Sequence, residues 1–475
     1  MKSEIWFEWE RQATVHPIRM CMNAWMEPME KAYGRPWPRT VIIYNGEIVS
    51  WYNLWADLLD YGQYLINIFV EESEQKKLLN NVEAQATELR KMFSKFDSID
   101  LHKVTDNELL STYEELNKKY VGWFVPGGLV EPIGHRGERL VRELLSSLPE
   151  SEKNELFSLI TTTTHESFSK RELHDLLEIA IAKKHGNFTP SLLTKHAKKY
   201  FWLHNNYFST EVLDEKFFEK ELENALSTYP DPAGQIEKMD AELRSVAGKK
   251  AELVKKLQLN QKNQNLIKLL DLFAWYQDYR KEYTMQMLHY LDLILAEIGK
   301  RNGLSLNDMK YSFPSEVLAG RLDGRILKER KKRYLFHFDQ SNVIDGVGDW
   351  SKEEEERIFK STGHRDEVLE LTGMVANKGF VRGRARVTMS ISEAKHIQPG
   401  EILITSMTTP DFVTAIKRAA AIVTNEGGIL CHAAVVSREF GIPCMVGTKL
   451  ATKVFKTGDL LEVDCELGVV RKISE

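Results

Sequence analysis

The feature that most limits the fold of this chain is a very long helical pattern. From about Leu54 to about Gly303 apolar residues recur every three or four positions, with long charged side chains between them. This spacing places the apolar residues on one face of an α-helix. The segment 236–272 also shows heptad-like spacing, which indicates either one long helix or a helical hairpin. We therefore expect a large helical domain in this part of the chain.

The pattern differs on both sides of the helical segment. Residues 41–44 and 47–49 are typical of two short strands, joined by Asn45-Gly46, a pair that suits a two-residue type I′ turn. After residue 371 short apolar runs alternate with turns, which predicts strands at 385–387, 401–405, 421–424 and 460–464 and helices at 411–419 and 433–440. The predicted organisation is a mainly helical domain at 1–345, a linker or hinge at 346–370 and a compact α/β domain at 371–475.

Composition narrows the classes of function. With 475 residues, 43% hydrophobic and 28% charged, the sequence is typical of a globular protein of more than one domain. No apolar run approaches the roughly 18 residues of a membrane span, and the N-terminus resembles no export signal, so we expect a cytoplasmic protein. A net charge of -5 argues against a nucleic-acid partner. The four cysteines form no Cys-x-x-Cys pair, so we expect neither a disulfide framework nor a metal site.

One stretch near the C-terminus carries residues suited to phosphoryl chemistry. A predicted strand ends at Thr424, Gly427 and Gly428 follow, and His432 stands where a helix of small and apolar residues begins. Helix N-termini favour anions, and glycines let the backbone approach a phosphate closely. An imidazole is a competent nucleophile near neutral pH. From these residues alone, a structural histidine remains an alternative to a phosphoryl carrier.

The motif Thr-Asn-x-Gly-Gly-x-x-Cys-His-Ala-Ala, followed by Ser-Arg-Glu-x-Gly-Ile-Pro, resembles the phosphohistidine motif of phosphoenolpyruvate synthase, pyruvate phosphate dikinase and rifampicin phosphotransferase. The resemblance extends over about residues 371–474 and implies a swivelling phosphohistidine domain of β/β/α type. It implies that His432 accepts the phosphoryl group and that Gly427 and Gly428 shape its loop.

The same resemblance suggests supporting roles for three further residues. Thr424 and Arg438 are candidates for contacts with the phosphoryl group, and Cys431 corresponds to a cysteine beside the histidine in phosphoenolpyruvate synthases. The alternatives are that Thr424 only ends a strand and that Arg438 is a surface residue paired with Glu439. For Cys431 we expect a packing role.

Two parts of the related enzymes are not recognisable in this sequence, the ATP-grasp domain and the phosphoenolpyruvate-binding barrel. The resemblance therefore implies a separate ATP-grasp subunit that uses Mg-ATP to phosphorylate His432, and an acceptor other than pyruvate. Phenylphosphate synthase, with its ATP-binding and histidine portions on different chains, is a precedent. No cofactor is expected to bind this chain alone.

Segments of the helical part resemble the acceptor-binding domain of rifampicin phosphotransferases, at 196–207 and across 266–327. This resemblance points to Trp202, Tyr207, Trp275 and Arg280 as residues that bind a small-molecule acceptor. The alternative is that Tyr200, Phe201 and Trp202 belong to the core.

Three hypotheses follow. In the first, the chain is one component of a split phosphotransferase. In the second, it is a non-catalytic phosphocarrier or regulatory protein whose partner binding depends on phosphorylation of His432. In the third, the helical part is a scaffold and the histidine is vestigial.

Overall fold

The computed structural model describes residues 6–339, 342–359, 370–389, 391–394, 396–408, 412–426 and 432–473. The chain forms two compact units. The helical unit consists of Ala13–Glu47 and Asn53–Gly348, and the C-terminal unit combines Asp349–Glu475 with two segments from near the N-terminus, Met1–Gln12 and Ile48–Tyr52. Among the described residues, no helix is both long and apolar enough to cross a membrane.

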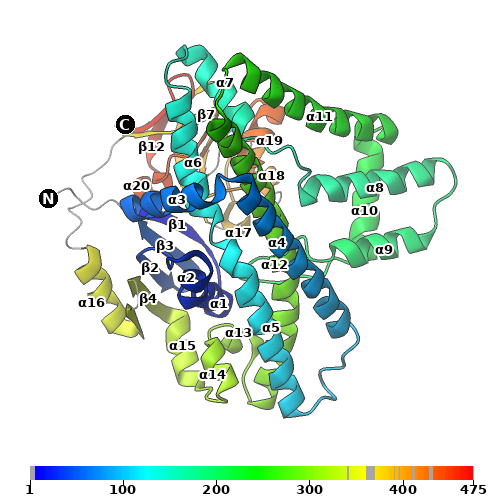
Figure 1. Cartoon of the computed structure of the whole chain (residues 1–475), viewed down its shortest axis with the longest axis vertical. Helices are drawn as coiled ribbons and strands as arrows, with labels where there is room; N and C mark the ends of the chain where they lie inside the picture. The colour runs from blue at the N-terminus through cyan, green and yellow to red at the C-terminus, as the bar shows by residue number, and fades with distance from the viewer. Residues whose placement is uncertain are drawn as a thin grey trace. The chain divides into compact units, whose positions relative to one another are not determined.

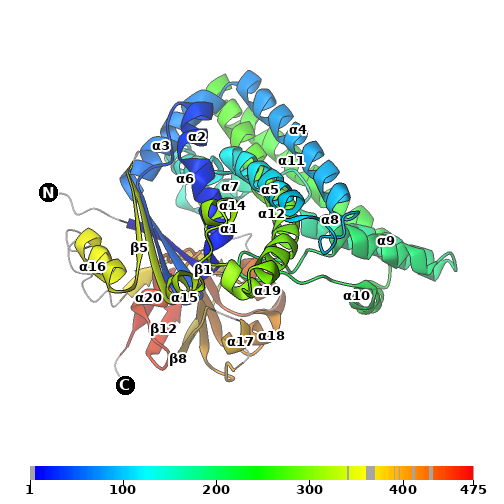
Figure 2. The same cartoon turned by 90° about the horizontal axis from the view of Figure 1, so that it is seen from below.

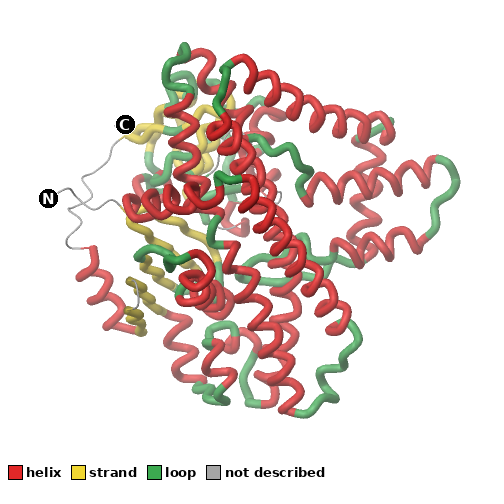
Figure 3. Tube along the Cα trace, viewed as in Figure 1, coloured by secondary structure: helices red, strands yellow, loops and turns green. Residues whose placement is uncertain are grey.

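Most of the helical unit is α-helix, as Figure 3 shows in red. Its helices are α1 (Val15–Trp25), α2 (Glu27–Tyr33), α3 (Trp55–Phe69), α4 (Glu72–Phe96), α5 (Asp106–Gly127), α6 (Val130–Leu144), α7 (Glu150–Thr161), α8 (Phe168–Lys184), α9 (Pro190–Tyr200), α10 (Glu215–Thr228), α11 (Pro232–Lys256), α12 (Gln261–Arg301), α13 (Leu306–Met309), α14 (Pro314–Leu318) and α15 (Gly324–Lys332).

The long helix α12 organises this unit. Its 41 residues span about 60 Å, and it packs against α4, α5, α6, α7 and α8 (Figure 1). It begins where the Asn260 side chain accepts the backbone N–H of Asn263 at 3.0 Å. It ends before Gly303, whose φ of 69° suits a glycine after a helix. The heptad-like segment is divided between two helices, because α11 ends before Gln258, which has a φ of 48°, and α11 packs on α7 and α8.

Residues 6–347 also contain strands that the sequence prediction missed. The two strands expected around Asn45-Gly46 are present as β2 (Thr40–Asn45) and β3 (Ile48–Leu54). The expected type I′ turn on Asn45-Gly46 is not formed, because such a turn needs a positive φ at both residues and of these two only Gly46 has one. Asn45 is the last residue of β2, and the turn lies at 46–47. In addition, β4 (Arg333–Asp339) pairs antiparallel with β2 on one side and with β5 (Asn342–Val347) on the other. The prediction of a single hairpin in residues 1–345 was therefore incomplete, as it also omitted β1 (Trp6–Gln12).

The C-terminal unit is built on an eight-stranded sheet with the order β6-β13-β12-β8-β9-β10-β11-β7. Strands β8 to β11 are parallel, and the outer pairs are antiparallel. Its elements are α16 (Gly348–Phe359), β6 (Glu370–Thr372), β7 (Met374–Asn377), β8 (Phe380–Val387), α17 (Ile391–Ala394), β9 (Ile402–Thr405), α18 (Val413–Ile416), β10 (Ala421–Thr424), α19 (His432–Phe440), β11 (Cys444–Val446), α20 (Ala451–Val454), β12 (Leu460–Asp464) and β13 (Val469–Lys472).

Alternate residues of the central strands face two different cores. In β9, Leu403 packs into a cluster with α19, whereas Ile402 and Ile404 pack into a second cluster with residues of β12 and β13. Figure 2 shows α17 and α18 beside the strands. Both faces of the parallel strands are thus buried, which agrees with their continuous apolar sequence. The predicted strands at 401–405, 421–424 and 460–464 correspond to β9, β10 and β12.

The segment predicted as a linker, 346–370, contains the end of β5, helix α16 and the first residue of β6. Residues 360–369 lie outside the described part of the chain.

Candidate active site

The candidate site lies between β10 and α19. Strand β10 ends at Thr424 and α19 begins at His432, which is the predicted order of strand, turn and helix. Gly427, Gly428 and Cys431 lie outside the described residues, as do the side chains of His432 and Arg438. The structure therefore describes the residues on either side of this loop, which hold its two ends in place.

Thr424 fixes the chain where it enters the loop. Its side chain is fully buried, and its hydroxyl donates to the carbonyl oxygen of Glu426 at 2.6 Å. Its own carbonyl oxygen accepts the backbone N–H of Thr448 at 3.0 Å and the Thr448 hydroxyl at 2.9 Å. Buried groups with these bonds resist displacement, because breaking them leaves unsatisfied polar atoms. Thr424 thus braces the loop through backbone contacts.

Asn425 connects the loop to α20. Its side-chain Nδ2 donates to the Thr452 hydroxyl at 2.5 Å, and its Oδ1 accepts the Thr452 backbone N–H at 3.0 Å. The next residue, Glu426, donates its backbone N–H to the Ser406 carbonyl oxygen at 2.8 Å, and its carboxylate accepts the Ser406 hydroxyl at 3.1 Å. The sequence predicted no role for Thr448 or Thr452. They lie 24 and 27 residues after their partners Thr424 and Asn425, and no local sequence pattern indicates a contact over such a distance.

Helix α19 is held by an apolar face and by a side-chain amide. Ala433 and Ala434 are buried in the core below the helix. Asn377 Nδ2 donates to the carbonyl oxygens of Ile442 at 2.8 Å and Ser437 at 3.3 Å. These two hydrogen bonds fix the position of the C-terminal end of α19. The N-terminal end of the helix, where His432 stands, offers backbone N–H groups and a partial positive charge suited to a phosphoryl group.

The predicted acceptor residues lie in different surroundings. Trp202 is a core residue: it is 1% exposed, its Nε1 donates to the Lys199 carbonyl oxygen at 2.9 Å, and its ring packs edge-on against Phe168. For this residue the structure supports the alternative of core packing. Tyr207 is half-buried, and its carbonyl oxygen accepts the backbone N–H and the hydroxyl of Thr14.

Trp275 and Arg280 both lie on α12 but have different neighbours. Trp275 is half-buried and stacks on Tyr279 with ring centroids 4.6 Å apart. Arg280 is 8% exposed, and its Nη1 donates to the carbonyl oxygen of Gly127, the last residue of α5, at 2.6 Å. A cation at the C-terminal end of a helix is favourable, so this contact stabilises α5.

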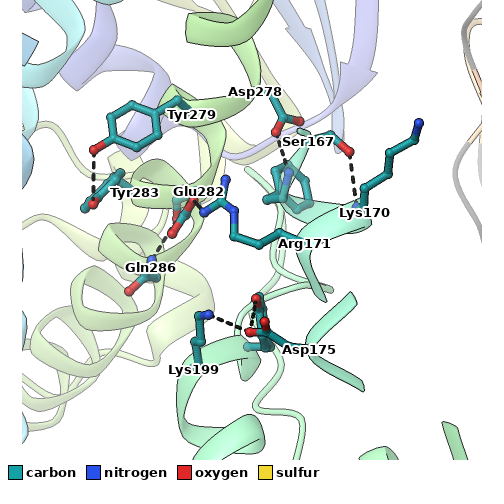
Figure 4. Close-up of polar contacts among 12 residues, drawn as sticks. Ser167, Lys170, Arg171, Asp175, Lys199, Asp278, Tyr279, Glu282, Tyr283 and Gln286 are labelled. Atoms are coloured by element: carbon teal, nitrogen blue, oxygen red, sulfur yellow. Dashed lines mark hydrogen bonds and ion pairs between the residues drawn. The ribbon is translucent and has the colours of Figure 1, made fainter. Parts of the chain in front are cut away.

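A polar junction joins α12 to α8 one turn beyond Trp275 (Figure 4). Asp278 accepts the backbone N–H of Phe168, the first residue of α8, at 2.7 Å, and burial raises the pKa of this carboxyl group. One turn further, Arg171 and Glu282 form an ion pair at 2.9 Å. The contact of Asp278 satisfies a backbone N–H in the first turn of α8, so this carboxyl group fixes the start of that helix. The sequence predicted no role for Asp278.

Comparison with known proteins finds relatives for part of the C-terminal unit. Residues 397–468 match the model of the PEP-utilising enzyme, mobile domain. The probable phosphoenolpyruvate synthase of Archaeoglobus fulgidus is 48% identical over 131 residues, which are 28% of this chain and 17% of the relative. The phosphoenolpyruvate synthase of Pyrococcus furiosus is 55% identical over 102 residues, 22% of this chain and 12% of the relative.

A third relative extends the match. The uncharacterized phosphotransferase YvkC of Bacillus subtilis is 29% identical over 192 residues, 38% of this chain and 23% of the relative. The chain spans less than a quarter of the length of each of these three relatives. The matched family segment contains β9, β10, α19 and His432. Residues 397–468 of this chain are therefore similar to the mobile domain of PEP-utilising enzymes.

Proposed function

We propose that this chain is the histidine-bearing component of a phosphotransferase. His432 is transiently phosphorylated from Mg-ATP by a separate ATP-grasp subunit and passes the phosphoryl group to an acceptor bound by the helical unit. The observation that carries the proposal is the position of His432 as the first residue of α19 within a mobile domain of this family.

The chemistry requires three successive substitutions at phosphorus. An imidazole nitrogen of His432 forms a bond to the β-phosphorus of ATP while the bond from that phosphorus to the oxygen of AMP breaks. A water then attacks the γ-phosphorus of the diphosphoryl group on the histidine, the bond between the β and γ groups breaks, and inorganic phosphate leaves. An acceptor oxygen then attacks the phosphorus that remains on the histidine, the phosphorus–nitrogen bond breaks, and the imidazole returns to its neutral state. Positioning and charge stabilisation are the main catalytic effects in such transfers.

The described residues of the loop support this role in two ways. Thr424 and Asn425 hold the strand side of the loop through buried hydrogen bonds, so little reorganisation is needed when charge develops. The N-terminus of α19 favours the negative charge of a phosphoryl group.

A second candidate function is a phosphocarrier or regulatory protein without an acceptor of its own. The core position of Trp202 and the helix-capping contact of Arg280 favour this candidate, because both residues have structural roles in the helical unit. Binding of a small-molecule acceptor to the helical unit would decide against it.

The first test is labelling with ATP that carries radiolabel at the β or the γ position, with and without a purified ATP-grasp protein. We expect acid-labile label from the β position only when the partner is present. The label should disappear in His432→Ala and persist in His396→Ala, which removes an exposed histidine of the same domain. Absence of label with an active partner would contradict the phosphocarrier role in both candidate functions.

A further inference from the structure

Within the helical unit, the helices α8 to α11 form an arm with a hydrophobic core of its own. The buried residues of this core include Leu177, Trp202, Phe218 and Leu222, and Met285 is the only described hydrophobic residue of α12 that packs against them. Figures 1 and 2 both show the arm extending to one side of α12. Because the arm buries most of its apolar residues internally, its core does not depend on α12.

The seam between this arm and α12 is mainly polar. Asp278 and Glu282 of α12 contact the backbone N–H of Phe168 and the side chain of Arg171 in α8 (Figure 4). Two turns beyond Glu282 the contacts continue at Asp292, which also lies on α12 and meets the segment between α9 and α10. Polar interfaces between separate cores permit relative movement, whereas large apolar interfaces oppose it.

A small pocket lies on this seam. Its lining includes Leu288, Leu291 and Leu295 of α12 together with Tyr207 and Thr210 from the segment between α9 and α10. Its empty space, open mouth included, is about 230 Å³, of which the enclosed part holds about one water molecule. Pockets for organic ligands measure about 300 Å³ or more. Such a ligand therefore enters only if the arm moves away from α12.

The charged groups that line this pocket are Asp292 and Lys310, and the arm provides a partner for each of them. Lys310 Nζ is 2.8 Å from Asp292 Oδ2 and donates to the Phe208 carbonyl oxygen at 3.1 Å. The same Asp292 oxygen accepts the Thr210 hydroxyl at 2.7 Å. Both charged side chains are only 13% exposed. When the arm moves away, Asp292 loses a hydrogen-bond donor and Lys310 loses an acceptor.

A hydroxyl group on a ligand replaces both lost partners at once, because one hydroxyl donates a hydrogen bond and also accepts hydrogen bonds. The three leucines in the lining favour an apolar body beside that hydroxyl. The charges of the ion pair cancel, so this pair does not select an ionic ligand.

We propose that the arm is a lid over an acceptor site at Asp292 and Lys310, and that this site takes an apolar molecule that carries a hydroxyl group. The inference deepens the proposed function by naming the class of the acceptor. It rests on that function only for the transfer itself, in which the hydroxyl oxygen is the atom that attacks phosphorus.

The first measurement tests the lid by amide hydrogen exchange of the full chain, without ATP or a partner subunit. The amides of Thr14 and Phe168 report on opening, because each N–H group donates across the contact between the arm and the rest of the unit. In Glu282→Gln both amides should exchange about three to ten times faster, while residues 176–180 in the core of the arm stay protected. The matched control is Glu115→Gln, which removes an ion pair between α4 and α5 and should leave both amides unchanged.

The second measurement tests the site by comparing the affinities of benzyl alcohol and toluene in ligand-observed NMR. Benzyl alcohol should bind more tightly than toluene, although toluene is the more hydrophobic of the two. Lys310→Met should weaken benzyl alcohol binding about tenfold. Thr210→Val should strengthen it about threefold, because the ligand no longer competes with the hydroxyl of the lid. The control is Thr194→Val, which removes an exposed hydroxyl of α9 and should change neither affinity.

The rise in affinity in Thr210→Val is the distinguishing result, because a threonine with a purely structural role predicts weaker binding when it is replaced. Unchanged exchange of both reporter amides in Glu282→Gln, or an equal rise in Glu115→Gln, would overturn the lid. Toluene binding at least as tight as that of benzyl alcohol would overturn the hydroxyl site. Neither measurement requires phosphorylation of His432, so failure of the labelling test alone would contradict the proposed function and leave this site supported.

Discussion

A buried histidine of the helical unit predicts a specific sensitivity to acid. His16, on α1, is fully buried, with Nδ1 2.9 Å from the Ser312 hydroxyl oxygen and Nε2 2.9 Å from the Tyr113 hydroxyl oxygen. Because the Ser312 hydroxyl donates to the Met309 carbonyl oxygen at 2.7 Å, its oxygen must accept from Nδ1–H. Nε2 then accepts from Tyr113, so the neutral imidazole is fully satisfied.

The magnitude follows from the pKa of this group. Burial lowers the pKa of His16 from 6.5 to about 3, with Arg330 acting in the same direction. Between these two values the unfolded chain binds a proton that the folded chain does not, so the free energy of unfolding falls as the pH falls through this range. From about pH 8 to about pH 5 the expected loss is about 2 kcal/mol.

The assay is urea unfolding of the wild type and of His16→Gln across this pH range, followed by far-UV circular dichroism. The variant lowers stability at every pH because it disturbs a buried hydrogen-bond pair, but it lacks the titrating group. The wild type should lose about 2 kcal/mol more than the variant between about pH 8 and about pH 5. Parallel pH profiles for the two proteins would refute the reasoning.

Three further predictions concern single side chains. Thr424→Val should lower the free energy of unfolding of the C-terminal unit by about 1–3 kcal/mol and slow the labelling of His432. Thr424→Ser should restore both the stability and the labelling rate. Urea unfolding and measured labelling rates check this prediction. Tyr276→Phe should leave stability unchanged or raise it by up to about 1 kcal/mol, because the buried Tyr276 hydroxyl has no hydrogen-bond partner among the residues that the structure describes. A clear loss of stability in urea unfolding would contradict this. Trp202→Ala should cost about 3–5 kcal/mol in thermal unfolding, and near wild-type stability would argue against its core role.

The elements that the sequence predicted well are those with strong local patterns. The apolar spacing around α12 follows the 3.6-residue period over many turns, so the helix is recognisable without its neighbours. Strands β9 and β10 are short, continuous apolar runs between turn residues, which is typical of buried parallel strands. Their bounds in the structure differ from the predicted ones by at most one residue.

The strands that the sequence prediction missed depend on distant partners. In β4, Tyr334, Leu335 and Phe336 are buried in succession, without the alternation that marks a half-exposed strand. Its hydrogen-bond partner β2 begins at Thr40, nearly three hundred residues earlier. Pairing over such a distance is decided by the packing of the whole unit and leaves no local signal.

The candidate site shows the same difference between features with a local sequence pattern and features that depend on distant residues. The sequence alone determined the identity of the motif, the place of His432 at the start of a helix and the family resemblance, because these depend on adjacent residues and on the dipole of one helix. Only the tertiary structure decided that Thr448 and Thr452 brace the loop and that Trp202 is a core residue. These roles arise from burial and from hydrogen bonds between residues far apart in the chain, and neither can be read from a residue's neighbours in sequence.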